Sequence, residues 1–171
     1  MDGARIANAA ATLGVSFKEI TTDAGVDILS FGGTKNGMML GESVITFRPE
    51  LAENMKYIRK QSTQLYSKMR FCSAQFLAYL ENDLWLQNAS HSNKMAQLLR
   101  SELEGVSNIQ FTQKTDGNIL LLKMDPAMIE RLLQKHFFYI WDEELHEIRL
   151  VTSWDTTEED VFSFVKEVKN I

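Results

Sequence analysis

One lysine lies among three glycines in the stretch SFGGTKNG, residues 30–37, directly after the apolar run VDILSF. Glycines allow a backbone to turn sharply and to come close to a ligand. Lys35 in such a turn could meet a bound anion as an ammonium, or attack a carbonyl as a neutral amine. Spacing alone favours a solvated turn lysine. The stretch is not a phosphate-binding loop of the G-x-x-x-x-G-K-[ST] type, because its spacing and the residue after Lys35 both differ.

Three further groups of polar residues stand out. Asp2 and Arg5 lie close together in the opening motif DGAR, for which an N-terminal helix cap is the alternative interpretation. Arg149 interrupts the apolar run EIRLV, so it either points outward from a sheet or grips a carboxylate with its two-pronged guanidinium. The third group is a cationic run, most of which we expect on the solvated face of a helix: Lys56, Arg59, Lys60, Lys68 and Arg70.

Composition argues against several classes of protein. Lys and Arg number 18 against 23 Asp and Glu, giving a net charge of −5, and no basic tract is present, which argues against a nucleic-acid binder. No apolar run reaches the roughly 18 residues of a membrane helix, and the N-terminus does not read as a secretory signal. The single cysteine, Cys72, fits a reducing cytosol. The three histidines are far apart, so we predict no zinc site.

The elements that must position these residues follow from periodicity and from turn residues. An alanine-rich helix is predicted over 2–13, stopped by Gly14, and Ser16 with Glu19 forms a capping-box pattern for a second helical turn. Strands are predicted over 26–31 and 42–47. Apolar residues from Leu51 to Leu80 recur at helical spacing and predict one continuous helical stripe, which we interpret as core packing. A further helix is predicted over 83–104.

The remaining sequence predicts a small compact α+β domain. Asp125 and Pro126 have the order expected at the start of a helix, and Thr156 or Thr157 is placed to cap the last helix. The predicted elements are strands over 109–113, 118–124, 137–141 and 147–152, with a helix over 126–134 and a last helix towards the C-terminus.

The paired motifs DGARIANA and DILSFGGTKNG resemble the threonine aldolase and β-eliminating lyase family, and so do IRKQSTQLYSKMRFCSAQF and EIRLVTSWDTTEEDV. Members of that family are pyridoxal-phosphate enzymes of the aspartate-aminotransferase-like fold type I. The resemblance covers nearly the whole chain. It implies an α/β fold class: the C-terminal part of the large domain of a pyridoxal-phosphate-dependent transferase, followed by a small α+β domain. We place the first over 1–80, including a long connecting helix, and the second over 81–171.

The resemblance also implies roles for individual residues. Lys35 matches the lysine that forms a Schiff base with the cofactor aldehyde, and Asp2 matches the aspartate that hydrogen-bonds the pyridine nitrogen. Arg5 matches an arginine at the cofactor and substrate anions. Arg149 matches the arginine that binds the substrate carboxylate, and Lys60 matches a lysine close to the active site. The implied reaction is the cleavage of a β-hydroxy-α-amino acid such as threonine to glycine and an aldehyde.

Family members are about twice as long, and what they carry before the DGAR motif has no counterpart here. We therefore expect a partial chain, the C-terminal half, which is cytoplasmic and associates with a missing N-terminal half or with copies of itself as a dimer or tetramer. Two alternatives are a non-catalytic remnant that works by pairing with other subunits, and a pyridoxal-phosphate lyase that catalyses β-elimination.

Overall fold

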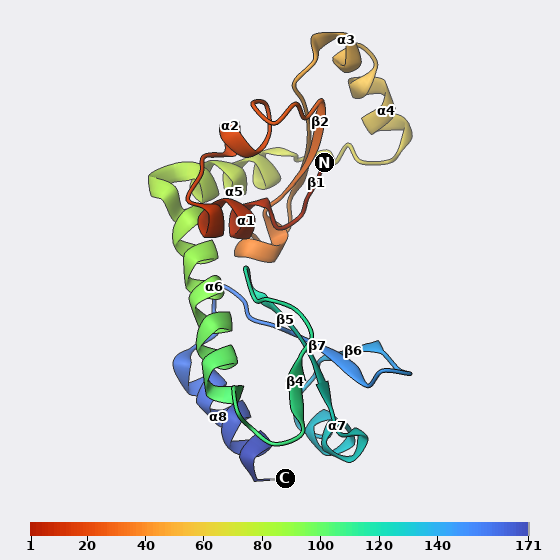
Figure 1. Cartoon of the computed structure of the whole chain (residues 1–171). Coiled ribbons are helices and arrows are strands. Elements are labelled where there is room, and N and C mark those ends of the chain that lie inside the picture. Colours follow the sequence, from red (N-terminus) through yellow and green to blue (C-terminus); the bar gives the residue numbers. More distant parts are fainter. Residues whose placement is uncertain (171) are drawn as a thin grey trace. The chain divides into compact units, whose positions relative to one another are not determined.

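A computed structural model describes residues 1–170 of the 171-residue chain (Figure 1). The chain divides into two compact units, the first formed by Met1–Asn88 and the second starting at Ala89. The division falls inside the longest helix, α6 (Leu84–Leu103), which contributes its first residues to one unit and the rest to the other.

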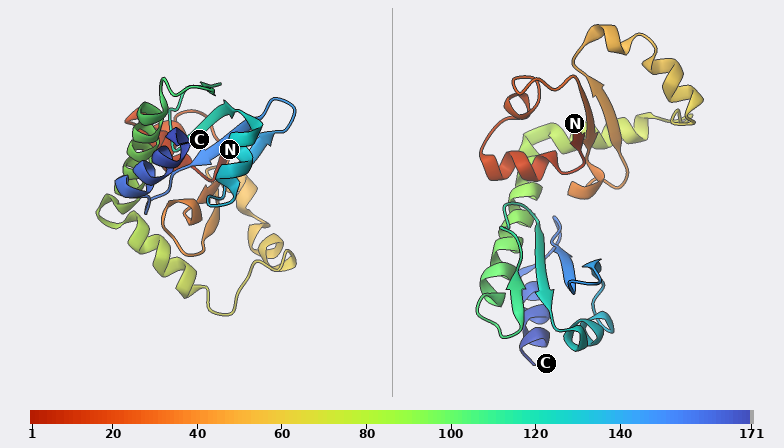
Figure 2. Two further views of the ribbon diagram at one scale, coloured as in Figure 1. Left: turned by 90° about the horizontal axis from the view of Figure 1, so that it is seen from below. Right: turned by 45° about the vertical axis from the view of Figure 1, so that its right-hand side comes forward.

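The first unit is built on a three-stranded sheet with the order β1-β2-β3. Strand β1 is parallel to β2, whereas β3 is antiparallel to it. The helical elements of this unit are short apart from α5 (Figure 2). Its elements before α6 are β1 (Asp2–Gly3), α1 (Ile6–Leu13), α2 (Phe17–Ile20), β2 (Ile28–Gly32), the 3₁₀ turn η1 (Thr34–Asn36), β3 (Glu42–Thr46), α3 (Pro49–Ala52), α4 (Met55–Gln61), α5 (Arg70–Leu80) and the 3₁₀ turn η2 (Glu81–Asp83).

One face of this sheet is covered and the other is open. Along β2, Leu29 and Phe31 are buried while Ser30 is exposed, as expected when side chains alternate between the faces of a strand. The Phe31 ring lies 6.3 Å from that of Tyr79 in α5, which places this helix on the covered face. The core of the first unit thus lies between β2 and the helices that follow and precede it.

The predicted helix over 2–13 is correct only from Ile6 onward. Met1–Gly3 is extended instead, because the Ser30 backbone N–H donates to the Met1 carbonyl at 3.0 Å and draws the chain into a parallel pair. An alanine-rich sequence favours a helix, but pairing with β2 outweighs this local preference. The C-terminal end agrees with the prediction, since Gly14 adopts the left-handed conformation with φ 66°.

The predicted continuous helix through residues 51–80 is wrong. The structure has α3 and α4, then no helix until Arg70. Thr63 lies in the left-handed region at φ 58°, which ends the helical path directly after α4. Helices α3 and α4 bury no residue and extend away from the sheet of the first unit (Figures 1 and 2), so no packing stabilises a longer helix there.

The second unit is a four-stranded antiparallel sheet with the order β4-β5-β7-β6. In β5 the buried and half-buried residues alternate strictly, so this strand has one fully covered face. Helices α6 and α8 lie side by side along that face (Figures 1 and 2). The elements are β4 (Ile109–Phe111), β5 (Ile119–Met124), α7 (Pro126–Leu133), β6 (Tyr139–Asp142), β7 (Glu147–Val151) and α8 (Glu158–Lys169).

The predicted strands and helices of this second unit are confirmed, with ends that differ by a few residues. The predicted caps are confirmed as well. Asp125 accepts from the Ala127 N–H at 2.9 Å, and Thr157 forms a reciprocal capping box with Asp160. The core of the unit is formed by Met95, Leu99, Leu103, Leu120, Leu122, Met124, Ile129, Leu132, Ile148, Leu150, Val161 and Val165, with neighbours. Within residues 1–170, no helix is long and apolar enough to cross a membrane.

Candidate active site

The parallel pairing of β1 with β2 brings two of the sequence motifs to one edge of a sheet. In this register Asp2 lies beside Ser30 and Gly3 beside Phe31. The residues that leave the carboxyl ends of both strands therefore emerge at the same edge, Arg5 from the first and Lys35 from the second. In open α/β sheets, ligands bind outside the carboxyl ends of parallel strands. Motifs about thirty residues apart in the sequence thus share one candidate binding edge.

Gly32 permits the close approach of these two segments. A Cβ atom at this position would lie 2.9 Å from the Ala4 Cα, closer than packed atoms tolerate. Any side chain here would push the turn after β1 away from β2. The glycine therefore brings the segment that carries Asp2 and Arg5 up to the segment that carries Lys35.

Lys35 lies in the middle of the 3₁₀ turn η1, at the carboxyl end of β2, and its side chain is exposed. The turn leaves through Gly37 at φ 103°, a conformation that L side chains rarely adopt. On the other flank, the Thr34 hydroxyl accepts from the Gly41 N–H at 3.0 Å and lies 3.2 Å from the Gly41 carbonyl. The glycines thus shape a tight turn that presents the lysine amine outward.

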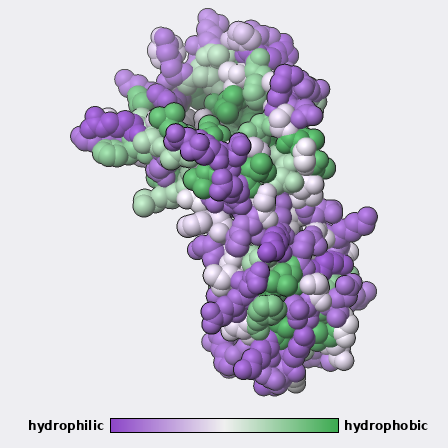
Figure 3. All heavy atoms as spheres, turned by 90° about the vertical axis from the view of Figure 1, so that its left-hand side faces the viewer, coloured by the Kyte–Doolittle hydropathy of each residue, from purple (hydrophilic) through white to green (hydrophobic). Residues whose placement is uncertain are grey.

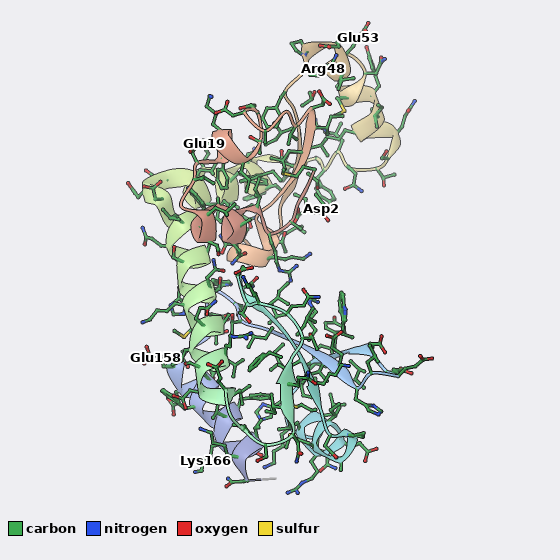
Figure 4. All side chains as sticks on the ribbon, viewed as in Figure 1. Asp2, Glu19, Arg48, Glu53, Glu158 and Lys166 are labelled. Carbon is green, nitrogen blue, oxygen red and sulfur yellow. The ribbon has the colours of Figure 1, made fainter. Side chains whose placement is uncertain are left out.

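Asp2 presents a carboxylate on the open face of the sheet (Figure 4). One of its oxygens, Oδ1, accepts from the Ala4 N–H at 2.9 Å, which fixes the side chain in a local turn. Because Asp2 is exposed, Oδ2 is accessible to a ligand. Arg5 is half-buried at the residue before α1, and its side chain does not cap that helix. The helix-cap interpretation of DGAR therefore does not hold.

Asn36 is a polar residue that sequence reasoning missed. It is only 2% exposed, and its Nδ2 donates to the Tyr79 hydroxyl at 2.7 Å and to the Trp85 carbonyl at 2.9 Å. The Asn88 amide donates to the Asn36 carbonyl at 3.0 Å. Burial raises the pKa of Tyr79 above its ordinary value. The signal available in the sequence was a polar amide directly beside the lysine, but nothing there indicated its partners in α5 and α6.

Arg149 belongs to the second unit, whereas Asp2, Arg5, Lys35 and Lys60 belong to the first. It lies in β7 between the buried residues Ile148 and Leu150, so its side chain is on the opposite face of the sheet. Its guanidinium carbon is 5.5 Å from the centre of the Trp141 ring, which is a cation–π contact that holds the guanidinium in place. Arg149 also lines a hollow of about 350 Å³ with Phe138, Tyr139 and Phe164, among others.

Lys60 is exposed near the end of α4. Strand β3 runs antiparallel to β2, so α3 and α4 follow from the end of the sheet opposite to the Lys35 turn. The structure therefore does not bring Lys60 to the edge that carries Lys35, and its role stays a prediction. Among residues 1–170, no three His, Cys, Asp or Glu side chains are grouped so that they could hold a metal ion.

Comparison with known families agrees with this architecture. A sequence model of the family described as beta-eliminating lyase matches residues 1–126. The chain belongs to the beta-eliminating lyase family. This confirms the resemblance drawn from the paired motifs around Asp2 and Lys35.

Two curated relatives are each named low specificity L-threonine aldolase. The one from a Pseudomonas species is 39% identical over 171 residues, which is 100% of this chain and 49% of the relative. The one from Pseudomonas aeruginosa is 40% identical over 170 residues, or 99% of this chain and 49% of the relative. The chain thus spans about half the length of the relatives that it matches.

The chain is similar to solved structures of known fold. A Leishmania major threonine aldolase matches with a TM-score of 0.89 at 29% identity, covering 99% of this chain and 50% of that one. An α-aminoadipate aminotransferase of Thermus thermophilus, solved with N-(5'-phosphopyridoxyl)-L-leucine, matches with a TM-score of 0.62 over 97% of this chain and 52% of its own. At 13% identity the second likeness concerns the fold alone. The predicted fold class, part of a fold type I transferase-like architecture, is confirmed.

Proposed function

We propose that this chain is the lysine-bearing half of a cytoplasmic, pyridoxal-phosphate-dependent aldolase, which cleaves a β-hydroxy-α-amino acid such as threonine to glycine and an aldehyde. The names of the relatives support this reaction. The observation that carries the proposal is the parallel pairing of β1 with β2, through which Asp2, Arg5 and Lys35 share one sheet edge.

The side chains at this edge suit pyridoxal phosphate by their chemistry. The exposed Lys35 amine is the group that would attach the cofactor aldehyde covalently. The accessible Oδ2 of Asp2 would hold a proton on the pyridine nitrogen, because a carboxylate accepts from a protonated ring nitrogen. Arg5 adds a cationic fork beside Asp2 for the cofactor or substrate anion.

Substrate binding is proposed to rest on Arg149. A guanidinium holds a carboxylate through two parallel hydrogen bonds, and the Trp141 ring restricts the directions in which this one can point. Arg149 would then orient the amino acid by its carboxylate, and Arg5 stays a further predicted contact for the cofactor or substrate anion. Lys60 is retained as a further predicted substrate contact.

The chain's own residues would divide the work of the reaction. The Lys35 amine, when not attached to the cofactor, would hold and return a proton at Nζ. Bound pyridoxal phosphate would supply an electron-withdrawing ring that accepts the electrons released when the Cα–Cβ bond breaks. Asp2 would keep the ring nitrogen protonated, and Arg149 would hold the carboxylate still.

The proposed partners are a small amino-acid substrate and other polypeptide chains, either copies of this one in a dimer or tetramer or a separate N-terminal half. Large apolar side chains are exposed on the first unit, among them Met39 at 91%, Leu77 at 73% and Val44 at 63%. Figure 3 shows hydrophobic residues at the surface of both units. Exposed apolar surface of this kind supports association with another chain.

A titration with pyridoxal phosphate, followed by visible absorbance, tests the proposal. The chain should give an absorbance band that Lys35→Ala lacks and that Lys56→Ala, which removes another exposed lysine of the same unit, retains. Borohydride reduction and peptide mass spectrometry should then locate the pyridoxyl group on Lys35. Equal uptake by the chain and by Lys35→Ala would overturn the assignment.

The family description favours one competing reaction, β-elimination. Release of acetaldehyde and glycine from threonine, without pyruvate and ammonia from serine, would support the aldolase. The reverse result would make the chain part of a β-eliminating lyase. A chain that takes up no cofactor, alone or mixed with its oligomeric partners, would be the non-catalytic remnant.

A further inference from the structure

We propose that Asn36 is a positioning residue that fixes the Lys35 turn, through its hydrogen bonds to α5 and α6. This inference rests on the proposed function only in what the turn is for, which is to present Lys35 to pyridoxal phosphate. Asn36 follows Lys35 directly, and it is one of the few buried polar residues of the first unit. It joins a surface turn to the hydrophobic core of that unit.

The geometry fixes the direction of the Asn36 amide. A backbone carbonyl can only accept, so the atom 2.9 Å from the Trp85 oxygen must be the amide nitrogen. The same nitrogen lies 2.7 Å from the Tyr79 hydroxyl, which therefore accepts its second proton. The Asn36 backbone carbonyl in turn accepts from the Asn88 side chain at 3.0 Å. Side chain and backbone of one residue are thus held by two helices.

The residues on both sides of Lys35 are held by hydrogen bonds, while the Lys35 side chain is exposed. Thr34 is tied to Gly41 on one flank, and Asn36 is tied to α5 and α6 on the other. The Asn36 N–H also donates to the Gly33 carbonyl at 3.0 Å inside the turn. The backbone beneath the lysine is therefore set by buried and part-buried hydrogen bonds, while the lysine side chain is exposed.

A fixed backbone beneath the lysine favours reaction, because the amine samples fewer orientations before the ligand arrives. Removing the Asn36 amide leaves the Tyr79 hydroxyl and the Trp85 carbonyl without this donor in a buried place. The turn should then open more often. We expect amide exchange across residues 33–41 to speed up by about tenfold, and the affinity for pyridoxal phosphate to fall by a similar factor.

The experiment compares three substitutions in the full chain. Asn36→Ala removes both donor bonds, and Tyr79→Phe removes only the hydroxyl that accepts one of them while keeping the ring. Asn118→Ala is the matched control in the second unit. Asn118 is 3% exposed, its Nδ2 donates to the Thr152 carbonyl at 2.7 Å, and, like that of Asn36, its buried Oδ1 has no partner within residues 1–170.

Hydrogen exchange of residues 33–41 is the readout that needs no cofactor. Faster exchange there in Asn36→Ala, a smaller increase in Tyr79→Phe and none in Asn118→Ala would support the proposal. Unchanged exchange in Asn36→Ala would overturn it. If Asn36→Ala does not fold, Tyr79→Phe decides by the same measure.

Cofactor uptake separates this inference from the proposed function. If the unsubstituted chain attaches pyridoxal phosphate at Lys35, Asn36→Ala should bind it about tenfold more weakly while Asn118→Ala binds it unchanged, although both lose thermal stability. Equal binding by Asn36→Ala and the unsubstituted chain would refute the positioning role. If the unsubstituted chain binds none, the proposed cofactor site fails, and hydrogen exchange still decides whether Asn36 holds the turn.

Discussion

Replacing Gly32 with alanine tests whether the close approach of two backbone segments holds the candidate site together. The added Cβ would lie 2.9 Å from the Ala4 Cα and 2.5 Å from the Glu42 Oε2. The glutamate is the exposed end of a flexible side chain and can swing away. The Ala4 backbone cannot, because it lies in the turn between β1 and α1.

The expected cost follows from what must move. Strand β1 is two residues long, so the strain is relieved most easily by lifting β1 from β2. Inserting a methyl group into a packed place costs about 1–3 kcal/mol. A loss of about 2 kcal/mol would lower the melting temperature of a chain of this size by roughly 4–8 °C. The carboxylate of Asp2 would shift together with β1.

The assay reads both effects. Circular dichroism gives the melting temperature, and hydrogen exchange of the Ser30 amide, which donates to the Met1 carbonyl at 3.0 Å, reports whether β1 remains paired. Gly25→Ala is the control, because a Cβ there meets no atom within 4 Å and the cost comes from its φ of 83° alone. Gly32→Ala should lose Ser30 protection, and Gly25→Ala should keep it. Unchanged melting and protection in Gly32→Ala would refute the reasoning.

Three further expectations concern the two cores and the titrating groups. Thr157→Ala removes a helix cap and should lower the free energy of unfolding, measured in urea, by roughly 1 kcal/mol. Hydrogen bonds from Thr157 lower the pKa of Asp160, so the part of this loss that comes from the Thr157 hydroxyl donating to the carboxylate is present above pH 3.8 and disappears as the pH falls further, whereas the part from the hydroxyl accepting the Asp160 N–H persists. A gap between variant and parent that does not narrow at low pH would contradict this. Burial raises the pKa of Tyr79 above 10.0, so the contribution of the neutral tyrosine to stability should be lost as the pH rises beyond that value. An ultraviolet titration should show a late-titrating tyrosine that Tyr79→Phe lacks. Identical titration curves for the two chains would contradict the raised pKa. Leu122 is 0% exposed, so Leu122→Ala should lower the free energy of unfolding, measured in urea, by about 2–5 kcal/mol. Leu77 is 73% exposed, so Leu77→Ala should change it by no more than about 0.5 kcal/mol. Similar losses in the two variants would contradict the assigned core.

Patterns within a few residues predicted the second unit well. The alternation in Ile119–Met124, the Asp125 cap with Pro126 and the Thr157 cap each correspond to an observed element. In each of these cases the local preference and the tertiary packing agree. The same holds for the capping box of Ser16 with Glu19 at α2.

Local patterns failed where packing disagreed with them. The stripe from Leu51 to Leu80 has helical spacing, but Leu51, Ile58 and Leu65 are 41%, 51% and 43% exposed. Periodicity reports that a helix could bury a face; it does not report whether a partner surface exists. The start of the chain failed for the opposite reason, because a partner strand was available to residues that locally favour a helix.

By itself, the sequence determined the family, the candidate residues Asp2, Arg5, Lys35 and Arg149, and most elements around them, since residue types and short spacings are written directly in the chain. Only the tertiary structure decided that β1 and β2 run parallel and so bring Asp2 and Lys35 to one edge. It alone revealed Asn36 as the buried tie beneath the lysine, because its partners in α5 and α6 lie 43 and 49 residues away along the chain. Contacts over such separations depend on how the whole unit packs, and no local pattern encodes them.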